Sequence, residues 1–214
     1  MTATSPINSF QINHDRSSTI RRKKTSEIIK VLIVGSHGVG KSAFVVKSLT
    51  KKFISEYGID NDVKYRFSEA IENEDFTVEI LDTCYRQDQE RFTSTENIKW
   101  ADAIIFIFSV TDRASFDYVN ILRQKIQDIK KRDKVPMMII GNKIDLVHRR
   151  QVYEEEAKQF AQECDIAYNE VSTAEKPFHG REYIVELVSE CLTMKKRSKT
   201  FLDKVFGGIV SNKR

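Results

Sequence analysis

The sequence is poor in the features that mark secreted and membrane-spanning proteins. Its three cysteines, Cys84, Cys164 and Cys191, are an odd number without CxxC spacing, which argues against a disulfide framework or a zinc site. The longest strongly apolar run, AIIFIFSV (103 to 110), is much shorter than the span of about 18 residues that a transmembrane helix needs. The N-terminus lacks the apolar block of a signal peptide. These absences predict an intracellular protein that is cytoplasmic, nuclear or nucleolar, or held peripherally at a membrane.

The small net charge of +4 hides an uneven distribution of charge along the 214 residues. Residues 195 to 214 contain seven Lys or Arg against one Asp, a net charge of +6, and residues 1 to 27 contain five against two, a net charge of +3. The middle of the chain, 28 to 194, is therefore left at −5. The Ser-, Thr- and Asn-rich segment 1 to 26 has no apolar period, which predicts a disordered basic extension. Residues 195 to 214 form a basic tail.

Strand-like and helix-like patterns alternate between residues 27 and 194, which predicts a single α/β domain with a mostly parallel sheet covered on both faces. The expected strands cover 27 to 35, 65 to 71, 76 to 82, 103 to 110, 135 to 142 and 166 to 171. The expected helices cover 41 to 53, 88 to 100, 115 to 131, 154 to 164 and 181 to 194.

The first motif with a chemical meaning is GSHGVGKS, Gly35 to Ser42, which matches G-x-x-x-x-G-K-[ST] at every fixed position. Between a strand and a helix, such a loop turns its backbone N–H groups inward as a nest for anions, and the helix N-terminus adds to it. Gly38 and Gly40 permit the tight turns, Lys41 would reach the β- and γ-phosphates, and the Ser42 hydroxyl would hold Mg²⁺. The flanking strand and helix disfavour a chance glycine-rich turn. The motif predicts binding of nucleotide phosphates.

The base is indicated by Gly-Asn-Lys-Ile-Asp, residues 141 to 145, which follow an apolar strand directly. A carboxylate at Asp145 accepts two parallel hydrogen bonds from the N1–H and N2–H₂ groups of guanine, and adenine cannot supply this pair. Asn142 would tie the base loop to the phosphate loop, and the stem of Lys143 would cover one face of the ring. Asn and Asp are ordinary turn residues, but their position after a phosphate loop favours guanine and disfavours a P-loop kinase or another ATPase.

Together these segments resemble the Ras superfamily of small GTPases over roughly residues 27 to 194. The resemblance rests on GSHGVGKSAF, FISEY (53 to 57), ILDT (80 to 83), WADAIIFIFSVTDRASFD (100 to 117), GNKIDL (141 to 146) and EVST (170 to 173). It implies a P-loop NTPase fold with a six-stranded, mostly parallel sheet, one antiparallel edge strand and helices on both faces. GTP or GDP and Mg²⁺ are the implied ligands.

The resemblance also implies roles for residues outside the two motifs. Phe53 would pack against guanine, Asp82 would hold Mg²⁺ through a water, and Ser172 to Ala174 would offer backbone contacts to the base, although the family usually has Ser-Ala-Lys there. Ser42 and Asp82 are thus the expected metal ligands. The expected nucleotide-binding residues are Gly35, His37, Gly38, Val39, Gly40, Lys41, Ser42, Ala43, Phe53, Asn142, Lys143, Asp145, Ser172, Thr173 and Ala174.

The chain departs from the family where the γ-phosphate would be sensed. Asp60 stands in place of the Thr that clasps Mg²⁺ and the γ-phosphate; an Asp can serve as a hard oxygen ligand, but it adds negative charge near a phosphate. The family's Asp-Thr-Ala-Gly-Gln has become Asp82-Thr83-Cys84-Tyr85-Arg86, so the hinge glycine and the water-orienting glutamine are both missing. His37 replaces a glycine of the phosphate loop. Because phosphoryl transfer depends on positioning and charge stabilisation, these changes predict hydrolysis that is slow or absent.

No catalytic residue is identified, and the candidates are Arg86, Gln87, Gln89 and His37. Arg86 would stabilise transition-state charge as an arginine finger does, and Gln87 or Gln89 would be a displaced water-orienting residue. The ordinary alternative for Arg86 is a solvated loop arginine. His37 would act as a general base or, more simply, fill space.

The nearest resemblance within the superfamily is to the divergent Ras-like set related to the oestrogen-regulated growth inhibitor and the Ras-like 10, 11 and 12 proteins. As in several of these, the chain ends without a Cys-a-a-X motif, so no prenyl anchor is expected. The tail KKRSKTFLDKVFGGIV (195 to 210) places basic residues beside Phe201, Leu202, Val205 and Phe206, which suits a short amphipathic turn on anionic lipid. RRKK (21 to 24) and KKRSK equally suit nuclear addresses or weak RNA contacts, or only solubility. No DNA-binding motif is present.

The sequence therefore predicts a guanine-nucleotide-binding signalling switch that acts on a protein effector and hydrolyses GTP slowly or not at all. Two alternatives stay open. One is an active GTPase that uses Gln87 or Gln89 to orient water, and the other is a pseudo-GTPase scaffold that works without nucleotide.

Overall fold

A computed structural model describes residues 9–11, 27–51, 62–71, 74–83, 93–131 and 134–210, with the backbone alone for 9–11, 199 and 201–210. The described strands are β1 (Ser9–Gln11), β2 (Ile28–Val34), β3 (Val63–Ile71), β4 (Glu74–Asp82), β5 (Ala103–Ser109), β6 (Met137–Asn142) and β7 (Ala167–Val171). The helices are α1 (Lys41–Thr50), α2 (Thr95–Trp100), α3 (Arg113–Lys130), the 3₁₀ turn η1 (Val147–Arg149), α4 (Glu154–Glu163) and α5 (Gly180–Val210).

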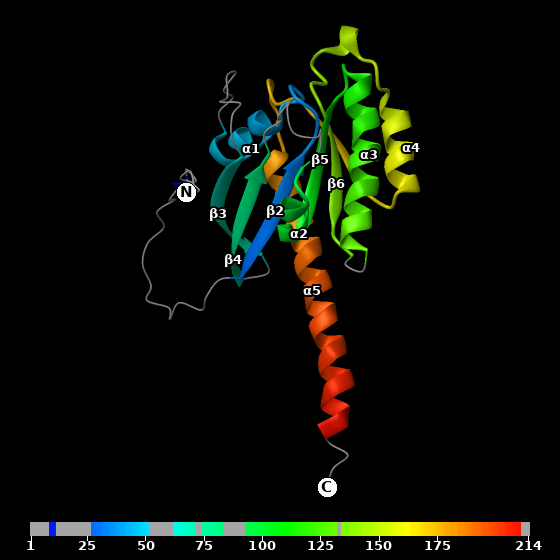
Figure 1. Cartoon of the computed structure of the whole chain (residues 1–214). Coiled ribbons are helices and arrows are strands. Elements are labelled where there is room, and N and C mark those ends of the chain that lie inside the picture. The colour runs from blue at the N-terminus through cyan, green and yellow to red at the C-terminus, as the bar shows by residue number, and fades with distance from the viewer. Residues whose placement is uncertain are drawn as a thin grey trace, which may run out of the picture.

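The strands form one sheet in the order β1-β3-β4-β2-β5-β6-β7 (Figure 1). The six strands β2 to β7 are the sheet that the sequence predicts. The pairs β4–β2, β2–β5, β5–β6 and β6–β7 are parallel, and among these six strands only β3–β4 is antiparallel. The loops that follow β2, β4, β6 and β7 consequently open at the same edge of the sheet. In open α/β sheets this carboxyl edge is where ligands bind.

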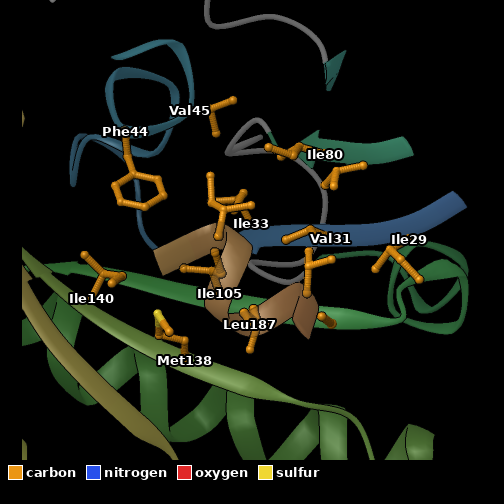
Figure 2. Close-up of a cluster of buried hydrophobic side chains, with 14 of the residues drawn as sticks. Ile29, Val31, Ile33, Phe44, Val45, Ile80, Ile105, Met138, Ile140 and Leu187 are labelled. Carbon is orange, nitrogen blue, oxygen red and sulfur yellow. The ribbon is translucent and has the colours of Figure 1, made fainter. Parts of the chain in front are cut away.

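The central strands are apolar throughout because both faces of the sheet are covered. Ile29, Val31 and Ile33 of β2 point into a core shared with α1 and α5, whereas Leu32 and Val34 point into a second core shared with α2, α3 and α4. Figure 2 shows the first core, in which Phe44 and Val45 of α1 and Leu187 of α5 approach the labelled side chains of β2, β4, β5 and β6. A rigid double-sided core therefore supports the carboxyl edge.

The predicted basic extension contributes a strand that the sequence does not predict. Ser9–Gln11 pairs in parallel with Lys64 to Arg66 of β3, so that β3 is the outer strand of the six but not of the whole sheet. The rest of the extension lies outside the described residues, and its disorder stays a prediction.

Helix α5 is longer than the pattern 181 to 194 predicts, since it runs without a break from Gly180 to Val210. Among the α5 residues whose side chains the structure describes, the last one in the buried core is Leu192. The continuation extends well beyond the body of the domain (Figure 1). Among the described residues, no helix combines the length and the apolar character needed to cross a membrane.

Candidate functional site

The phosphate-loop motif forms the connection between β2 and α1. Gly38 and Gly40 adopt positive φ angles of 72° and 96°, a left-handed region that glycine enters without steric cost. Gly40 is the N-cap of α1, no side chain caps the helix, and its first turn contains no acidic residue. The N-terminal N–H groups and the helix dipole of α1 are therefore suited to an anion.

Lys41 lies at the start of α1 with only 8% of its surface exposed. Its ammonium donates hydrogen bonds to the carbonyl oxygens of Gly35, at 3.0 Å, and Ser36, at 2.9 Å. The loop thus holds one positive charge against its own backbone. His37 lies at the exposed tip of the same loop, while Val39 and Ala43 are buried.

A buried carboxylate at the end of β4 faces this helix N-terminus. Asp82 is 4% exposed, and its Oδ1 atom has no hydrogen-bond partner among the described residues. Burial raises the pKa of Asp82 from 3.8 to about 6, although a hydrogen bond from Ser42 and the charge of Lys41 act in the opposite direction. The negative charge of Asp62 adds to the rise in pKa. A hydroxyl and an unsatisfied carboxylate oxygen are hard ligands that suit Mg²⁺, which keeps several waters and phosphate oxygens in its shell.

Asn142, at the end of β6, connects three loops through one fully buried amide. Its Nδ2 donates to the carbonyl of Val39 at 2.8 Å, and its Oδ1 accepts from the backbone N–H groups of Lys143, at 2.8 Å, and Thr173, at 3.2 Å. The contact with the phosphate loop that the sequence predicts for Asn142 is therefore present. A Cβ atom on Gly40 would lie 2.3 Å from Asn142 Nδ2, so the close approach of the two loops requires glycine.

The remaining residues of the predicted base loop lie beside it. Lys143 adopts a positive φ of 68°, and its ammonium donates to the carbonyl of Gly38 at 2.6 Å. Asp145 is partly rather than fully buried, and its Oδ1 accepts a hydrogen bond from the Ser172 hydroxyl at 2.7 Å. The same hydroxyl accepts from the Glu175 N–H at 3.0 Å. Ser172 and Thr173 are buried, whereas Ala174 is exposed.

The structure thus brings the phosphate loop, Asp82, the loop after β6 and the loop after β7 to one edge of the sheet. Several predicted residues cannot be placed, because Phe53, Asp60 and the stretch from Cys84 to Gln89, which includes Tyr85, Arg86 and Gln87, lie outside the described residues. Their roles stay predictions.

Two residues of the site have no counterpart among the predicted ones. Asp62 precedes β3 and acts electrostatically on Asp82. Lys47 of α1 is only 4% exposed and donates a hydrogen bond to the Thr173 carbonyl at 2.7 Å. A signal for Lys47 is present in the sequence, since a lysine occupies a position on the apolar face of α1 between Phe44, Val45 and Leu49.

Comparison with known proteins is consistent with this arrangement. The sequence profile of the Ras family matches residues 30–193. The chain therefore belongs to the Ras family and is a divergent small GTPase. Members of this family bind guanine nucleotide, typically with Mg²⁺, and act in signalling through effector proteins.

Several curated proteins are similar to the chain over most of its length. The chain is 38% identical over 167 residues to the Ras-related and estrogen-regulated growth inhibitor of Bos taurus, a match that covers 78% of this chain and 82% of that protein. The human protein of the same name is 37% identical over 167 residues, with the same coverage. Ras-like protein family member 11B of Xenopus laevis is 33% identical over 164 residues, which are 74% of this chain and 66% of that protein.

Proposed function

We propose that this protein is a guanine-nucleotide-dependent switch that retains GTP for long periods and signals by binding a protein effector. The observation that carries the proposal is that three features meet at one edge of the sheet. They are the N-terminus of α1, which has no side-chain cap and begins with Lys41, the buried Asp82, and Asp145 with its hydrogen bond from Ser172. These groups suit phosphates, a divalent cation and a guanine base respectively.

Phosphates would be held by the N–H groups of the loop from Gly35 to Gly40 and by Lys41. A bound Mg²⁺ would neutralise phosphate charge, with the Ser42 hydroxyl and the Asp82 carboxylate as the residues that hold it, directly or through water. A cation beside Asp82 also relieves the cost of burying its carboxylate. The site is therefore expected to retain nucleotide better with Mg²⁺ than without it.

The base would be recognised by Asp145. Its carboxylate has two oxygens with about four acceptor positions, and Ser172 uses one of them. The others remain available for N1–H and N2–H₂ of guanine. Adenine offers no such pair of donors at these positions, so the carboxylate would lose hydrogen bonds with ATP.

Slow hydrolysis is proposed from the residues that replace the family's catalytic ones. Tyr85 and Arg86 stand where a glycine and a water-orienting glutamine are usual, and the exposed His37 adds bulk to the phosphate loop. The groups that bind nucleotide are kept, whereas the group that positions the attacking water is not. The protein should therefore still bind GTP although it hydrolyses GTP slowly or not at all.

A single-turnover assay on the full chain tests this function. The purified protein is loaded with GTP and Mg²⁺, and the bound nucleotide is identified over time by chromatography. Retained GTP is the expected result. Rapid GDP formation that Gln87→Ala or Gln89→Ala abolishes, and that Gln162→Ala on the exposed face of α4 leaves intact, would establish the active enzyme instead. A protein that binds neither GTP nor GDP at high concentration would be a scaffold.

We further propose that the helical tail after Met194 contacts an anionic surface. The tail has a net charge of +6, and the sequence repeats apolar residues at helical spacing in Phe201, Leu202, Val205 and Phe206. A basic amphipathic helix of this kind favours anionic lipid.

A further inference from the structure

A lysine ammonium is buried beneath the loop that follows β7. Lys47 donates to the carbonyl oxygens of both Thr173 and Glu175, the first at 2.7 Å. It also lies 4.7 Å from the centre of the Phe178 ring, within the range of a cation–π interaction. Burial, and then the charge of Lys176, lower the pKa of Lys47, while Asp145 and Glu175 act in the opposite direction. A buried lysine needs such partners because desolvation of an ammonium is costly.

The segment held by Lys47 is the one that orients the base-recognition carboxylate. Ser172 donates to Asp145, and the Glu175 N–H donates back to the same hydroxyl. Lys47 donates hydrogen bonds to the carbonyl oxygens of residues 173 and 175, which flank the exposed Ala174. The position of the Ser172 hydroxyl therefore depends on a segment whose backbone is fixed by Lys47.

Close packing fixes the rest of this segment on α1. The rings of Phe44 and Phe178 meet edge to face at 5.8 Å. A Cβ atom on Gly180 would lie 2.4 Å from both Ser48 Oγ and the Phe178 ring, so the chain passes α1 too closely for a larger residue. The segment thus lies directly against α1.

Helix α1 consequently contacts both halves of the site. Lys41, at its first turn, holds the phosphate loop, and Lys47 lies six residues further along, a rise of about 9 Å at 1.5 Å per residue. A single rigid helix with one lysine on each loop fixes the separation between phosphate and base contacts.

We propose that Lys47 is a positioning residue for guanine recognition, which clamps the 172–175 segment to α1 and so holds Asp145 in place through Ser172. The proposal rests on the proposed guanine-nucleotide function and adds a determinant of nucleotide residence time that lies outside the binding motifs. Loss of the clamp frees the loop carbonyls and lets the Ser172 hydroxyl move. Guanine should then dissociate faster although no motif residue has changed.

The test compares the dissociation of GDP with that of inosine diphosphate. Inosine diphosphate lacks the 2-amino group, which in GDP would donate a hydrogen bond to the Asp145 carboxylate. In Lys47→Met, which keeps the aliphatic stem, GDP release should accelerate by about ten-fold or more, the effect of losing a hydrogen bond to a charged group. Release of inosine diphosphate should accelerate much less, because one of the two hydrogen bonds to Asp145 is already missing. Lys47→Arg, which keeps charge and donors, should fall between the wild type and Lys47→Met.

Two controls separate positioning from general destabilisation. Val188→Ala removes a buried side chain of α5 that belongs to the core and not to the 172–175 segment. It should leave the ratio of GDP to inosine diphosphate release unchanged even where its unfolding midpoint falls as far as that of Lys47→Met. Hydrogen exchange of the Thr173 and Glu175 amides should accelerate in Lys47→Met and not in Val188→Ala.

The outcomes distinguish the two proposals. A wild type that prefers GDP to ADP, combined with an unchanged release ratio and unchanged amide exchange in Lys47→Met, would overturn the clamp alone. A wild type without preference for GDP over ADP would overturn the proposed function, and the clamp's role in guanine recognition with it.

Discussion

At the residue scale, the buried polar groups of the site differ in whether the chain itself satisfies them. The Asn142 amide and the Lys41 and Lys47 ammonium groups all have backbone partners within the described residues. Asp82 is the exception, because its Oδ1 lacks a hydrogen-bond partner there. An unsatisfied buried carboxylate destabilises the fold unless a cation lies beside it.

Asp82→Asn is therefore expected to stabilise the metal-free protein. Because the folded-state pKa of about 6 exceeds the ordinary 3.8, the folded chain binds this proton more tightly, and the free energy of unfolding falls as pH rises from about 4 to about 6. The loss is at most about 3 kcal/mol. In EDTA at pH 8, thermal unfolding of Asp82→Asn should occur at or above the wild-type temperature, and this advantage should shrink at pH 5.

The same variant should lose the slowing of GDP release by Mg²⁺. A matched control is Asp117→Asn, because Asp117 is an exposed α3 residue paired with Arg113. It should keep both the Mg²⁺ effect and the wild-type trend of stability with pH. An Asp82→Asn protein that is less stable than wild type in EDTA at pH 8 would contradict the assignment of a costly buried charge.

The two left-handed glycines of the phosphate loop should respond differently to alanine. Gly38→Ala places its Cβ in open space and should cost only the backbone strain, about 1–2 kcal/mol in urea unfolding. Gly40→Ala adds a clash with Asn142 and should cost more, with loss of the hydrogen bond to Val39 and weaker GDP binding. Equal costs for the two substitutions would show that the loops can separate freely.

A residue of the site can be predicted from the sequence when a local motif defines its role, and cannot when contacts with distant segments define it. Lys41, Asn142 and Asp145 are predictable because their motifs follow a strand directly and the strand places them at a known edge of the sheet. Lys47 and Asp62 act through contacts with segments far away in the chain, 126 residues away in the case of Lys47 and Thr173. Such contacts follow from the fold and not from local pattern.

At the element scale, strands are predicted well and helix ends poorly. The apolar runs of β2, β5 and β6 are unambiguous because both faces of these strands are buried. The apolar periodicity of the sequence predicts that the helix beginning at residue 181 ends at residue 194, but α5 continues. The segment 195–206 contains no Gly or Pro that would interrupt the helix. The strand β1 has no periodic pattern, and only its pairing with β3 defines it.

Helix α5 should accordingly divide into a part that stabilises the domain and a part that does not. Leu187→Ala removes a side chain that is 1% exposed in the core of Figure 2, and should lower the free energy of unfolding by about 2–5 kcal/mol. Removal of residues 201–214 should change it by no more than about 0.5 kcal/mol, because the α5 residues described after Leu192 take no part in the buried core. Urea unfolding of both proteins measures the difference, and a large loss on truncation would mean that the tail packs on the domain.

At the scale of the whole molecule, charge is separated along the chain, with an acidic body and basic ends. Lys195, the first basic residue of the tail, is paired with Glu27 at 3.5 Å and Asp102 at 3.2 Å, which anchors α5 to the start of β2 and the turn before β5. The basic residues that follow it within α5, at positions 196, 197, 199 and 204, belong to a helix that extends away from the body (Figure 1). An anionic surface repels the acidic body of the protein. The same surface attracts the basic tail, so the tail is the region that would contact it.

The full chain is therefore expected to bind vesicles that contain phosphatidylserine, and a chain ending at Met194 is not. Each Lys or Arg near such a surface contributes about 1 kcal/mol, so binding should weaken strongly with rising salt. Phe201→Ser combined with Phe206→Ser keeps all the tail's charge but removes apolar area, and should reduce vesicle binding in a sedimentation assay while leaving any binding to RNA intact. If the double variant binds vesicles as the wild type does, charge alone attaches the tail and its apolar residues have no role. If the wild type binds RNA and no vesicles, the ligand of the tail is nucleic acid and not lipid.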